Sequence, residues 1–423
     1  MHEMQHRLSN LFYAVISLPA TAMGFALSIQ ISALSWLLTT RYGLDIHEVG
    51  IVWAAGPLAG IFGQVIVGLI SDNVWFWGGR RRPFVLIGGT LAALMLLALP
   101  NIGSIDAALG VGNLLAVAVA VALTLDLSIN VSFNPTRSVI ADVTPEGNAR
   151  TKGYTWMQTI SGFFGVLAYV VGAWFGNDTL ITAGVGVVFL FSVVPMFFIT
   201  ERREGPAAAA AERSTATEWG QLWRIYIAHG FSWIGVQTMF VYIIAFIQQR
   251  ILGDAPGAAV DSGPVIAVSF AVLNTVGFLL PAFVLEPLAE RFGRVRVHRA
   301  TVAVMAAGYF GIAFLASTPV TLYALMAVCG IGWASIVSLP FAIMSEKVDR
   351  SRMGFFMGIF NLSVVLPQLF VSLAVGAVVL AAPDKNVIFL ISGASLALSA
   401  LSWLFVREQR GTEAAAAPPP VSH

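Results

Sequence analysis

The amino-acid sequence predicts an all-α integral membrane protein with twelve transmembrane helices. Three properties of the 423-residue chain lead to this prediction: 57% of the residues are hydrophobic, only 11% are charged, and the mean hydropathy is +0.82. Soluble domains usually contain about 25% charged residues. So few charges leave too little polar surface to cover a globule of this size in water. We therefore expect lipid to surround most of the chain, and the composition argues against an ordinary cytosolic enzyme.

The predicted helices are apolar stretches that are long enough, or nearly so, to cross about 30 Å of hydrocarbon with about 20 residues. Glycine and proline recur inside them, which membrane helices tolerate when neighbouring helices satisfy the freed backbone groups. We therefore interpret every stretch as a helix. The stretches lie at residues 11–38, 48–71, 83–100, 110–140, 153–176, 179–199, 223–248, 264–286, 300–317, 319–344, 354–380 and 386–406.

Basic residues predict the orientation of these helices. Nineteen of the 23 basic residues lie in the termini and the even-numbered loops, and three, Arg41, Arg250 and Lys385, lie in the odd-numbered loops. Arg137 lies inside a span. Loops rich in Lys and Arg stay on the cytoplasmic side. We therefore expect a multi-pass protein of the cell (inner) membrane with both termini in the cytoplasm.

The longest interior break, residues 200–221, is charged and alanine-rich and separates six spans from six. Two parallel halves around a central site are typical of secondary carriers. The loops after spans 2 and 8 match weakly, since each has an acid followed by glycine and arginine. The tail lacks the apolar residues needed to fold. The predicted parts are an N-terminal half 1–200, a cytoplasmic linker 201–222, a C-terminal half 223–406 and a disordered tail 407–423.

Several classes of function find no support in the residues. The net charge of +1 gives no reason to expect nucleic acid as a partner. The single cysteine, Cys329, cannot form an internal disulfide or a cysteine-rich metal site. The chain has no P-loop and no H-E-x-x-H motif, and its polar start runs directly into a span too long for a cleavable signal peptide. We therefore expect neither an enzyme nor a cofactor, and active transport would depend on an ion gradient.

Asp126 is the one carboxylate near the middle of a predicted span. A charge there costs several kcal/mol, and such residues usually mark ion pathways or proton relays. The alternative is a structural acid that is hydrogen-bonded between helices. Because no other acid competes for the role, we expect Asp126 to couple a proton to transport and to take part in substrate binding.

A polar stripe extends from Asp126 along the same helix. Asn130 and Asn134 follow at four and eight residues, and Arg137, at eleven, returns to within about 20° of the same face. The helical rise places Arg137 about 16 Å nearer the cytoplasm, so a direct ion pair with Asp126 is not expected. We expect Asn130 and Arg137 to bind substrate. The alternative for Arg137 is a side chain that extends to the cytoplasmic membrane surface.

Amides and indoles inside the spans are further candidates. Together they offer a neutral polyol hydrogen bonds to its hydroxyls and an apolar surface under its ring. Each alone is more often a contact between helices. The substrate-binding candidates of this kind are Gln30, Gln158, Trp233, Gln237, Asn361 and Gln368, and weaker ones are Trp36, Gln64, Gln248, Gln249 and Asn274.

Several stretches resemble the sucrose–proton symporters and their bacterial relatives, a glycoside-pentoside-hexuronide:cation symporter-like group within the major facilitator superfamily. The GGRRRPF loop at 78–84 and the N-L-x-x-V-x-P-Q run within 354–376 are fairly specific. The remaining similar stretches are 52–72, 126–142 and 338–346, so that the resemblance covers both halves.

The resemblance implies a major facilitator fold of two six-helix halves and assigns roles to particular residues. The family's proton site and the arginine that its sugar transport requires fall on Asp126 and Arg137, which the polar stripe had already indicated. The loop that holds Asp72, Arg80, Arg81 and Arg82 corresponds to the cytoplasmic gating loop. One departure is that plant members have acidic residues at the outer end of span 7, where this chain has Gln248 and Gln249.

The function predicted from the resemblance is import of a disaccharide with a proton by alternating access, with sucrose as the first candidate and maltose or another α-glucoside as the second. The residues alone indicate only a small neutral polar solute. The expected partners are sugar, proton and lipid bilayer, and we expect a monomer. One alternative is a proton-coupled efflux antiporter for amphiphilic compounds, which the phenylalanine-rich spans would suit. The other is a non-transporting membrane sensor, which would not need a charge inside the membrane.

Overall fold

The fold comes from a computed structural model, which describes residues 8–61, 70, 74–144, 148–201, 217–253, 261–345, 347–348 and 353–408. These residues form helices and connecting loops, with no β-strand among them. The helices of the first half are α2 (Asn10–Trp36), α3 (Ile46–Trp53), α5 (Arg82–Ala98), α6 (Ile102–Leu109), α7 (Leu114–Val143), α8 (Asn148–Phe175) and α9 (Asn177–Val193). Those of the second half are α10 (Trp219–Phe246), α11 (Ser262–Leu280), α12 (Glu286–Phe292), α13 (Arg294–Leu315), α14 (Pro319–Ile336), α15 (Leu339–Ser345), α16 (Met353–Phe370), α17 (Gly376–Ala381) and α18 (Val387–Ser402).

The prediction of an all-α membrane protein is confirmed. Within the described residues, eleven helical segments are long and apolar enough to cross a membrane. The predicted second span, 48–71, is described as the shorter apolar helix Ile46–Ile61. Residues 62–69 and 71–73, with Gln64 and Asp72, lie outside the described residues, as do most of the predicted linker and tail.

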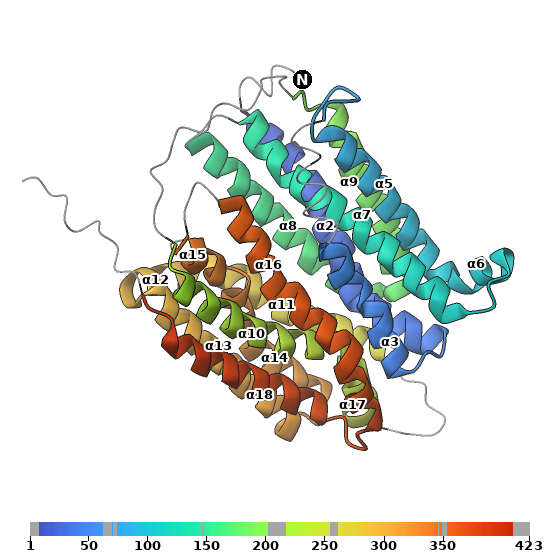
Figure 1. The fold of residues 1–423 in the computed structure, drawn as a ribbon. Coiled ribbons are helices and arrows are strands. Elements are labelled where there is room, and N and C mark those ends of the chain that lie inside the picture. The colour runs from blue at the N-terminus through green and yellow to red at the C-terminus, as the bar shows by residue number, and fades with distance from the viewer. Residues whose placement is uncertain are drawn as a thin grey trace, which may run out of the picture.

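The helices form two bundles that lie side by side (Figure 1). In one, α2 packs against α8 and α9, and α5 against α7 and α9. In the other, α10 packs against α16 and α18, and α13 against α14 and α18. The bundles meet where α8 lies against α11, α2 against α10 and α11, and α3 against α17.

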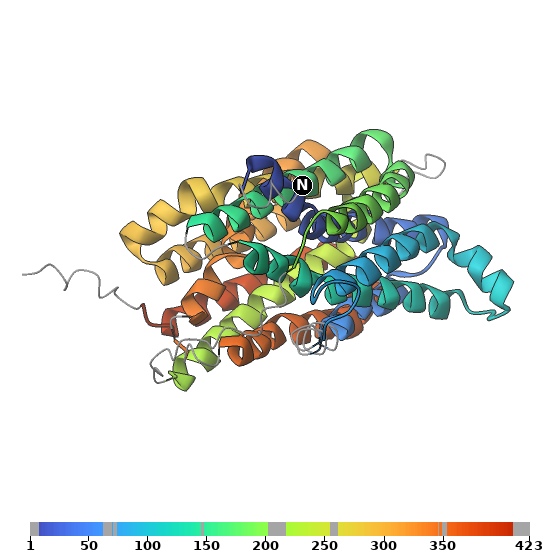
Figure 2. The same ribbon diagram turned by 90° about the horizontal axis from the view of Figure 1, so that it is seen from above.

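The two ends of the bundles differ. In Figure 1 the helices run from the top and left, where α2 begins and α18 ends, to the right and bottom, where α3, α6 and α17 lie. We call the first end the terminal side and the second the far side. The helix α6 projects at the edge of the far side in both views (Figures 1 and 2).

Some helices begin with side chains that satisfy their free backbone N–H groups. Asp45 accepts hydrogen bonds from the backbone nitrogens of His47 and Glu48 before α3, and the Glu48 side chain accepts one from the Asp45 nitrogen. This reciprocal capping box satisfies several donors at once. Thr318 and Thr321 form the same arrangement at the start of α14.

In the described part of the chain, four helices are followed by a π-helical turn, at Leu37–Arg41, Ile247–Ile251, Pro281–Leu285 and Val371–Val375. Such turns are rare and often occur at functional sites. The first two follow α2 and α10, which are the first helices of the two halves. This shared ending is a structural sign of an internal repeat.

A buried acid secures the start of α5. The two carboxylate oxygens of Glu201 accept hydrogen bonds from the backbone nitrogens of Arg80, Arg81 and Arg82 at 2.7 to 2.9 Å. An anion at a helix N-terminus satisfies free donors and interacts favourably with the helix dipole. A Cβ atom at Gly79 would collide with the Glu201 side chain, so glycine is required for this approach.

The second half repeats this arrangement at α13. Glu408, which follows the last span, accepts hydrogen bonds from the backbone nitrogens of Arg294 and Val295 at 2.8 and 3.0 Å. Gly293, with φ of +93°, precedes them, and a Cβ atom there would lie 2.6 Å from Glu408 Oε2. In both halves, therefore, an acid that follows the last span caps the helix of the third span. The sequence pattern indicated the matching loops but not these two acids.

Candidate functional site

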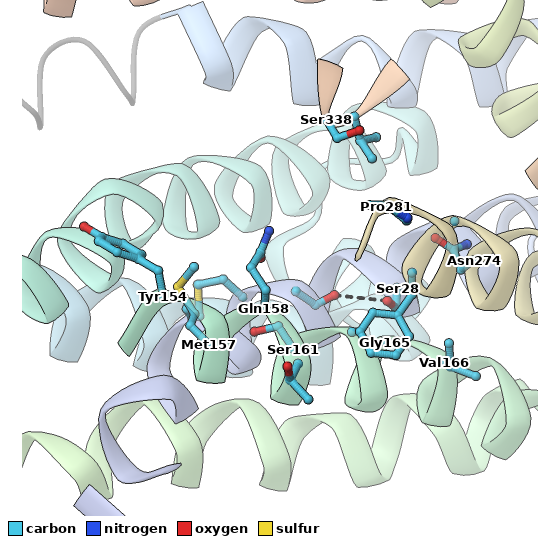
Figure 3. A pocket seen from close by; sticks show the side chains of 18 of the residues that line it. Ser28, Tyr154, Met157, Gln158, Ser161, Gly165, Val166, Asn274, Pro281 and Ser338 are labelled. Carbon is cyan, nitrogen blue, oxygen red and sulfur yellow. Dashed lines mark hydrogen bonds between the residues drawn. The ribbon is translucent and has the colours of Figure 1, made fainter. Parts of the chain in front are cut away.

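A cavity of about 830 Å³ lies between the two bundles. Its walls come from α2, α7 and α8 of the first half and from α11, α14 and the turns after them in the second half (Figure 3). The residues contributed by α7, α11 and α14 lie in the parts of these helices nearer the terminal side. The cavity therefore extends from the middle of the bundle toward the terminal side. Its volume is within the range of about 300–1,000 Å³ that is usual for small-molecule sites.

Arg137 lies on the α7 wall, where its side chain is exposed to the cavity. Its guanidinium carbon is 4.2 Å from the centre of the Phe133 ring, one turn earlier on the same helix. The Tyr154 hydroxyl donates a hydrogen bond to the Arg137 backbone oxygen at 3.3 Å. The cation–π contact holds the guanidinium over an aromatic face. No carboxylate in the described part of the chain forms an ion pair with it, so that its donors remain available to a ligand.

The remaining polar lining comes from both halves. Gln158 and Ser161 lie on α8, and Ser28 on α2 is hydrogen-bonded to Tyr169 (Figure 3). Asn274 of α11 lies on the other side of the cavity. Hydroxyl and amide groups both donate and accept hydrogen bonds, as a solute rich in hydroxyl groups requires.

Trp333 provides an aromatic surface on the second-half wall. Its indole nitrogen donates to Asn274 Oδ1 at 3.2 Å, and the Trp233 and Phe240 rings pack edge-on against it at 6.0 and 5.3 Å between ring centres. A Cβ atom at Gly277 would lie 2.6 Å from Trp333 Cδ1, so glycine is needed for the indole to occupy this position. Trp333 was not among the residues predicted from the sequence, although it is the one aromatic residue in the run GIGWAS at 330–335.

Asp126 lies outside the cavity lining. Its side chain is 4% exposed, and the equally buried Gln30 amide nitrogen lies 3.1 and 3.0 Å from its two carboxylate oxygens. On the other side, a Cβ atom at Gly56 in the helix Ile46–Ile61 would lie 3.5 Å from Asp126 Oδ2. The Asp126 side chain therefore lies between this helix and Gln30 of α2. Asn130 donates its side-chain amide to the Asp126 backbone oxygen at 2.8 Å. Among the described residues, no hydrogen bond or ion pair joins Asp126 to Arg137.

The other substrate-binding candidates of the second half lie outside the cavity lining that the structure describes. Gln368 donates to Gln237 at 3.3 Å and joins α16 to α10. Trp233 donates a hydrogen bond to His229 Nε2 at 3.0 Å. Its ring packs against Trp333, which does line the cavity. Asn361 is partly exposed on α16.

The predicted gating loop makes contacts within the first half. Arg80 and Arg81 form ion pairs with Asp142, near the end of α7, at 2.9 and 3.3 Å. The Arg82 guanidinium lies over the Phe197 ring at 5.5 Å. These contacts fasten the start of α5 to the ends of α7 and α9.

The departure from plant sequences at the end of span 7 also has a structural role. Gln249 donates its amide to the Pro383 backbone oxygen at 2.8 Å and accepts from the Lys385 backbone nitrogen at 2.7 Å. It therefore fastens the loop between α17 and α18 to the end of α10. An acidic side chain could accept the second of these hydrogen bonds but could not donate the first.

Two helical bundles with a cavity between them, lined in part by polar side chains of both halves, are typical of a membrane carrier of the alternating-access type. The chain belongs to the Major Facilitator Superfamily, whose family model matches residues 16–370 and, in a second match, 269–421. It is similar to the sucrose transport protein SUC4 of Arabidopsis thaliana, with 24% identity over 421 residues, 84% of this chain and 82% of the relative. It is also similar to the general alpha-glucoside permease of Schizosaccharomyces pombe, with 25% identity over 57% of this chain and 51% of the relative.

The fold is also found among solved structures. The inward-open conformation of the xylose transporter XylE from E. coli matches with a TM-score of 0.70 and 15% identity, over 95% of this chain and 97% of that one. At this identity the match shows the fold alone. The relatives with known roles are transport proteins and not enzymes.

Proposed function

We propose that this protein imports a disaccharide together with a proton, with sucrose as the first candidate and maltose or another α-glucoside as the second. One observation supports this most directly. The cavity combines an arginine without an ionic partner in the described structure, from one half, with a fixed indole from the other. The names of two relatives, a sucrose transport protein and an alpha-glucoside permease, support the same class of substrate.

The two groups suit different parts of a sugar. The planar guanidinium of Arg137 can donate to two neighbouring hydroxyl groups, which a point charge does less well. The Trp333 indole offers an apolar face to the C–H side of a pyranose ring. Gln158 and Asn274 lie at the same cavity and supply further donors and acceptors. A sugar held by both groups would connect the two halves, whose relative movement is the transport step.

Asp126 is the proposed proton site. In the structure its carboxylate is buried and has a neutral partner, Gln30. Burial in a low-dielectric region penalises the charged form of a carboxyl group, and protonation removes the charge. Gln30 and Asp126 lie on α2 and α7, which also contribute Ser28 and Arg137 to the cavity wall. A change of charge at Asp126 would therefore act on two helices that surround the sugar.

The proposed orientation places both termini in the cytoplasm of a cell whose inner membrane holds the protein as a monomer. The asymmetric distribution of basic residues supports it. In this orientation the terminal side faces the cytoplasm, and the cavity of the structure extends toward it. The conformation is then the one from which imported sugar leaves.

Transport into proteoliposomes tests the proposal. Liposomes with an alkaline interior and a more acidic exterior should accumulate labelled sucrose above the external concentration, and collapsing the pH gradient should abolish the accumulation. Maltose uptake should compete with sucrose uptake. Protein-dependent uptake of neither sugar, with the protein folded and correctly inserted, would contradict the assignment.

A further inference from the structure

The two halves are joined on the far side by a short hydrogen bond between an indole and a carboxylate. Trp36, the last residue of α2, donates its indole nitrogen to Asp261 Oδ1 at 2.6 Å. Asp261 precedes α11, and the same oxygen accepts from the Gly263 backbone nitrogen at 2.9 Å. A hydrogen bond to a carboxylate is roughly twice as strong as one between neutral groups. The contact therefore connects the halves more strongly than an ordinary polar contact.

We propose that the Trp36–Asp261 hydrogen bond is the latch that keeps the far side of the carrier closed while the cavity is open on the terminal side. Asp261 and Trp36 thereby become gating residues of the transport cycle. The proposal rests on the alternating access of the proposed function, but it does not depend on which solute is carried.

The position of the latch supports this role. Ser28 on α2 and Asn274 on α11 both line the cavity. Trp36 lies eight residues further along α2, and Asp261 lies thirteen residues before Asn274, which corresponds to roughly 12 Å and 20 Å of helix. The latch therefore joins the outer ends of two helices that are cavity walls. A path from the far side into the cavity requires these ends to separate.

Gly263 shows how closely the halves approach at this point. A Cβ atom there would lie 2.9 Å from Asn177 Nδ2, 3.1 Å from Asp261 Oδ1 and 3.2 Å from Trp36 Nε1. Asn177 and Trp36 belong to the first half, and Asp261 belongs to the second. The glycine therefore leaves the space that polar groups of both halves occupy when the far side is closed. Asn177 is buried, and its amide nitrogen has no hydrogen-bond partner among the described residues.

A second contact on the far side brings the helices together without a strong polar bond. A Cβ atom at Gly50 on α3 would lie 2.5 Å from both the Ser372 backbone oxygen and the Tyr242 hydroxyl oxygen. Tyr242 donates to the Val371 oxygen at 3.1 Å, inside the π-helical turn before α17. Close packing of this kind favours the closed state, but its contacts are weak individually. Ser35 of α2 also donates a hydrogen bond to the Val241 backbone oxygen of α10 at 3.1 Å, but of these two hydrogen bonds between the halves only the one from Trp36 to Asp261 has a carboxylate acceptor.

A neighbouring tryptophan offers a matched control. Trp53 donates its indole nitrogen to Ser35 Oγ at 2.9 Å, and both residues belong to the first half. Trp36 and Trp53 are each 8% exposed. Replacing either by phenylalanine removes one indole hydrogen bond from a buried site. Trp36→Phe removes a bond between the halves and leaves Asp261 in place as the cap of α11, whereas Trp53→Phe leaves the Ser35 hydroxyl free to keep its own hydrogen bond to the Val241 backbone oxygen of the second half.

The experiment measures the distance between the two halves on the far side. Spin labels are attached to Thr40→Cys and Ala381→Cys in the Cys329→Ala background, and double electron–electron resonance is recorded in nanodiscs without sugar. Thr40 and Ala381 are exposed on the far side, Thr40 in the π-helical turn that follows α2 and Ala381 as the last residue of α17. The parent should show mainly the short distance of the closed far side.

We expect Trp36→Phe to raise the ratio of long to short distances roughly tenfold, because a hydrogen bond to a charged group is lost. Trp53→Phe should keep the parent distribution, and Gly263→Ala should shift it in the same direction as Trp36→Phe. An unchanged distribution in folded Trp36→Phe, or an equal shift in Trp53→Phe, would overturn the proposal. If Trp36→Phe does not fold, the distance distribution of Gly263→Ala is the test instead. An unchanged distribution in that variant would then overturn the proposal. The distance measurement involves neither sugar nor a pH gradient. A negative result would therefore contradict the latch without contradicting the proposed transport function.

Discussion

Gln30 binds both oxygens of the Asp126 carboxylate through a single amide nitrogen, at 3.1 and 3.0 Å. The two residues are 96 positions apart in the chain, on α2 and α7. A neutral amide can donate to a charged carboxylate and can also remain bonded to a protonated one. The pair therefore suits a group that gains and loses a proton during a cycle better than a salt bridge would, because an ion pair stabilises only the charged form.

The first prediction concerns Asp126→Asn, which copies the shape and the neutrality of the protonated acid. We expect the variant to lose accumulation of sugar driven by a pH gradient, while counterflow exchange, which moves no net proton, persists at a substantial fraction of the parent rate. The two assays should be performed on the same liposomes.

Asp178→Asn is the matched control, because Asp178 is an exposed acid that pairs with Arg41 at 3.1 Å. It should retain both accumulation and exchange. Full concentrative uptake by Asp126→Asn would remove Asp126 from the proton pathway.

The second prediction concerns Arg137→Lys. Lysine keeps the positive charge in the cavity but loses the planar set of donors, so we expect uptake to fall by about tenfold or more with unchanged membrane insertion. Arg224→Lys is the control, since Arg224 is an exposed residue outside the cavity that donates to the Phe405 backbone oxygen. Parent-like transport by Arg137→Lys would favour a role at the membrane surface.

The third prediction concerns the indole on the second-half wall. Trp333→Phe should raise the sugar concentration needed for half-maximal uptake by a few fold, and Trp333→Ala should raise it further, because less aromatic surface remains. Trp174→Ala removes an indole that is 78% exposed and lies outside the cavity lining, and it should change this concentration little. If Trp333→Ala and the parent need the same sugar concentration for half-maximal uptake, the indole is not part of the binding site.

The fourth prediction compares the two acids that cap α5 and α13. Glu201 is buried and accepts three backbone hydrogen bonds, whereas Glu408 is less buried and accepts two. We expect Glu201→Gln to destabilise the protein by about 1–3 kcal/mol and Glu408→Gln by less. Thermal unfolding in detergent, followed by the exposure of buried tryptophan, measures both. A larger effect at Glu408 would contradict this interpretation.

The fifth prediction concerns orientation. Ser214 lies in the expected linker, outside the described residues. With the buried Cys329 replaced by alanine, Ser214→Cys should react with a membrane-impermeant thiol reagent only from the cytoplasmic side. Labelling in intact cells from the outside would reverse the proposed orientation.

The sequence by itself predicted the membrane class, nearly all of the spans and the two halves, because each of these follows from local properties. In lipid a helix must satisfy its own backbone hydrogen bonds, so the length and the hydropathy of one segment are sufficient to identify it. The same logic made Asp126 conspicuous, since a carboxylate in the middle of an apolar run is costly wherever the helix lies. The periodicity of one helix was also sufficient to place Arg137 away from Asp126.

Only the tertiary structure decided which side chains meet. Gln30 became the partner of Asp126, Trp333 became part of the cavity wall because Gly277 leaves room for it, and Trp36 met Asp261 across the two halves. Each of these contacts joins segments far apart in the chain, and the apolar spans look alike in their hydropathy whichever face they turn toward the cavity. Helix packing inside the membrane depends on close fit and on a few polar contacts. That fit is a property of pairs of helices, so no single span contains it.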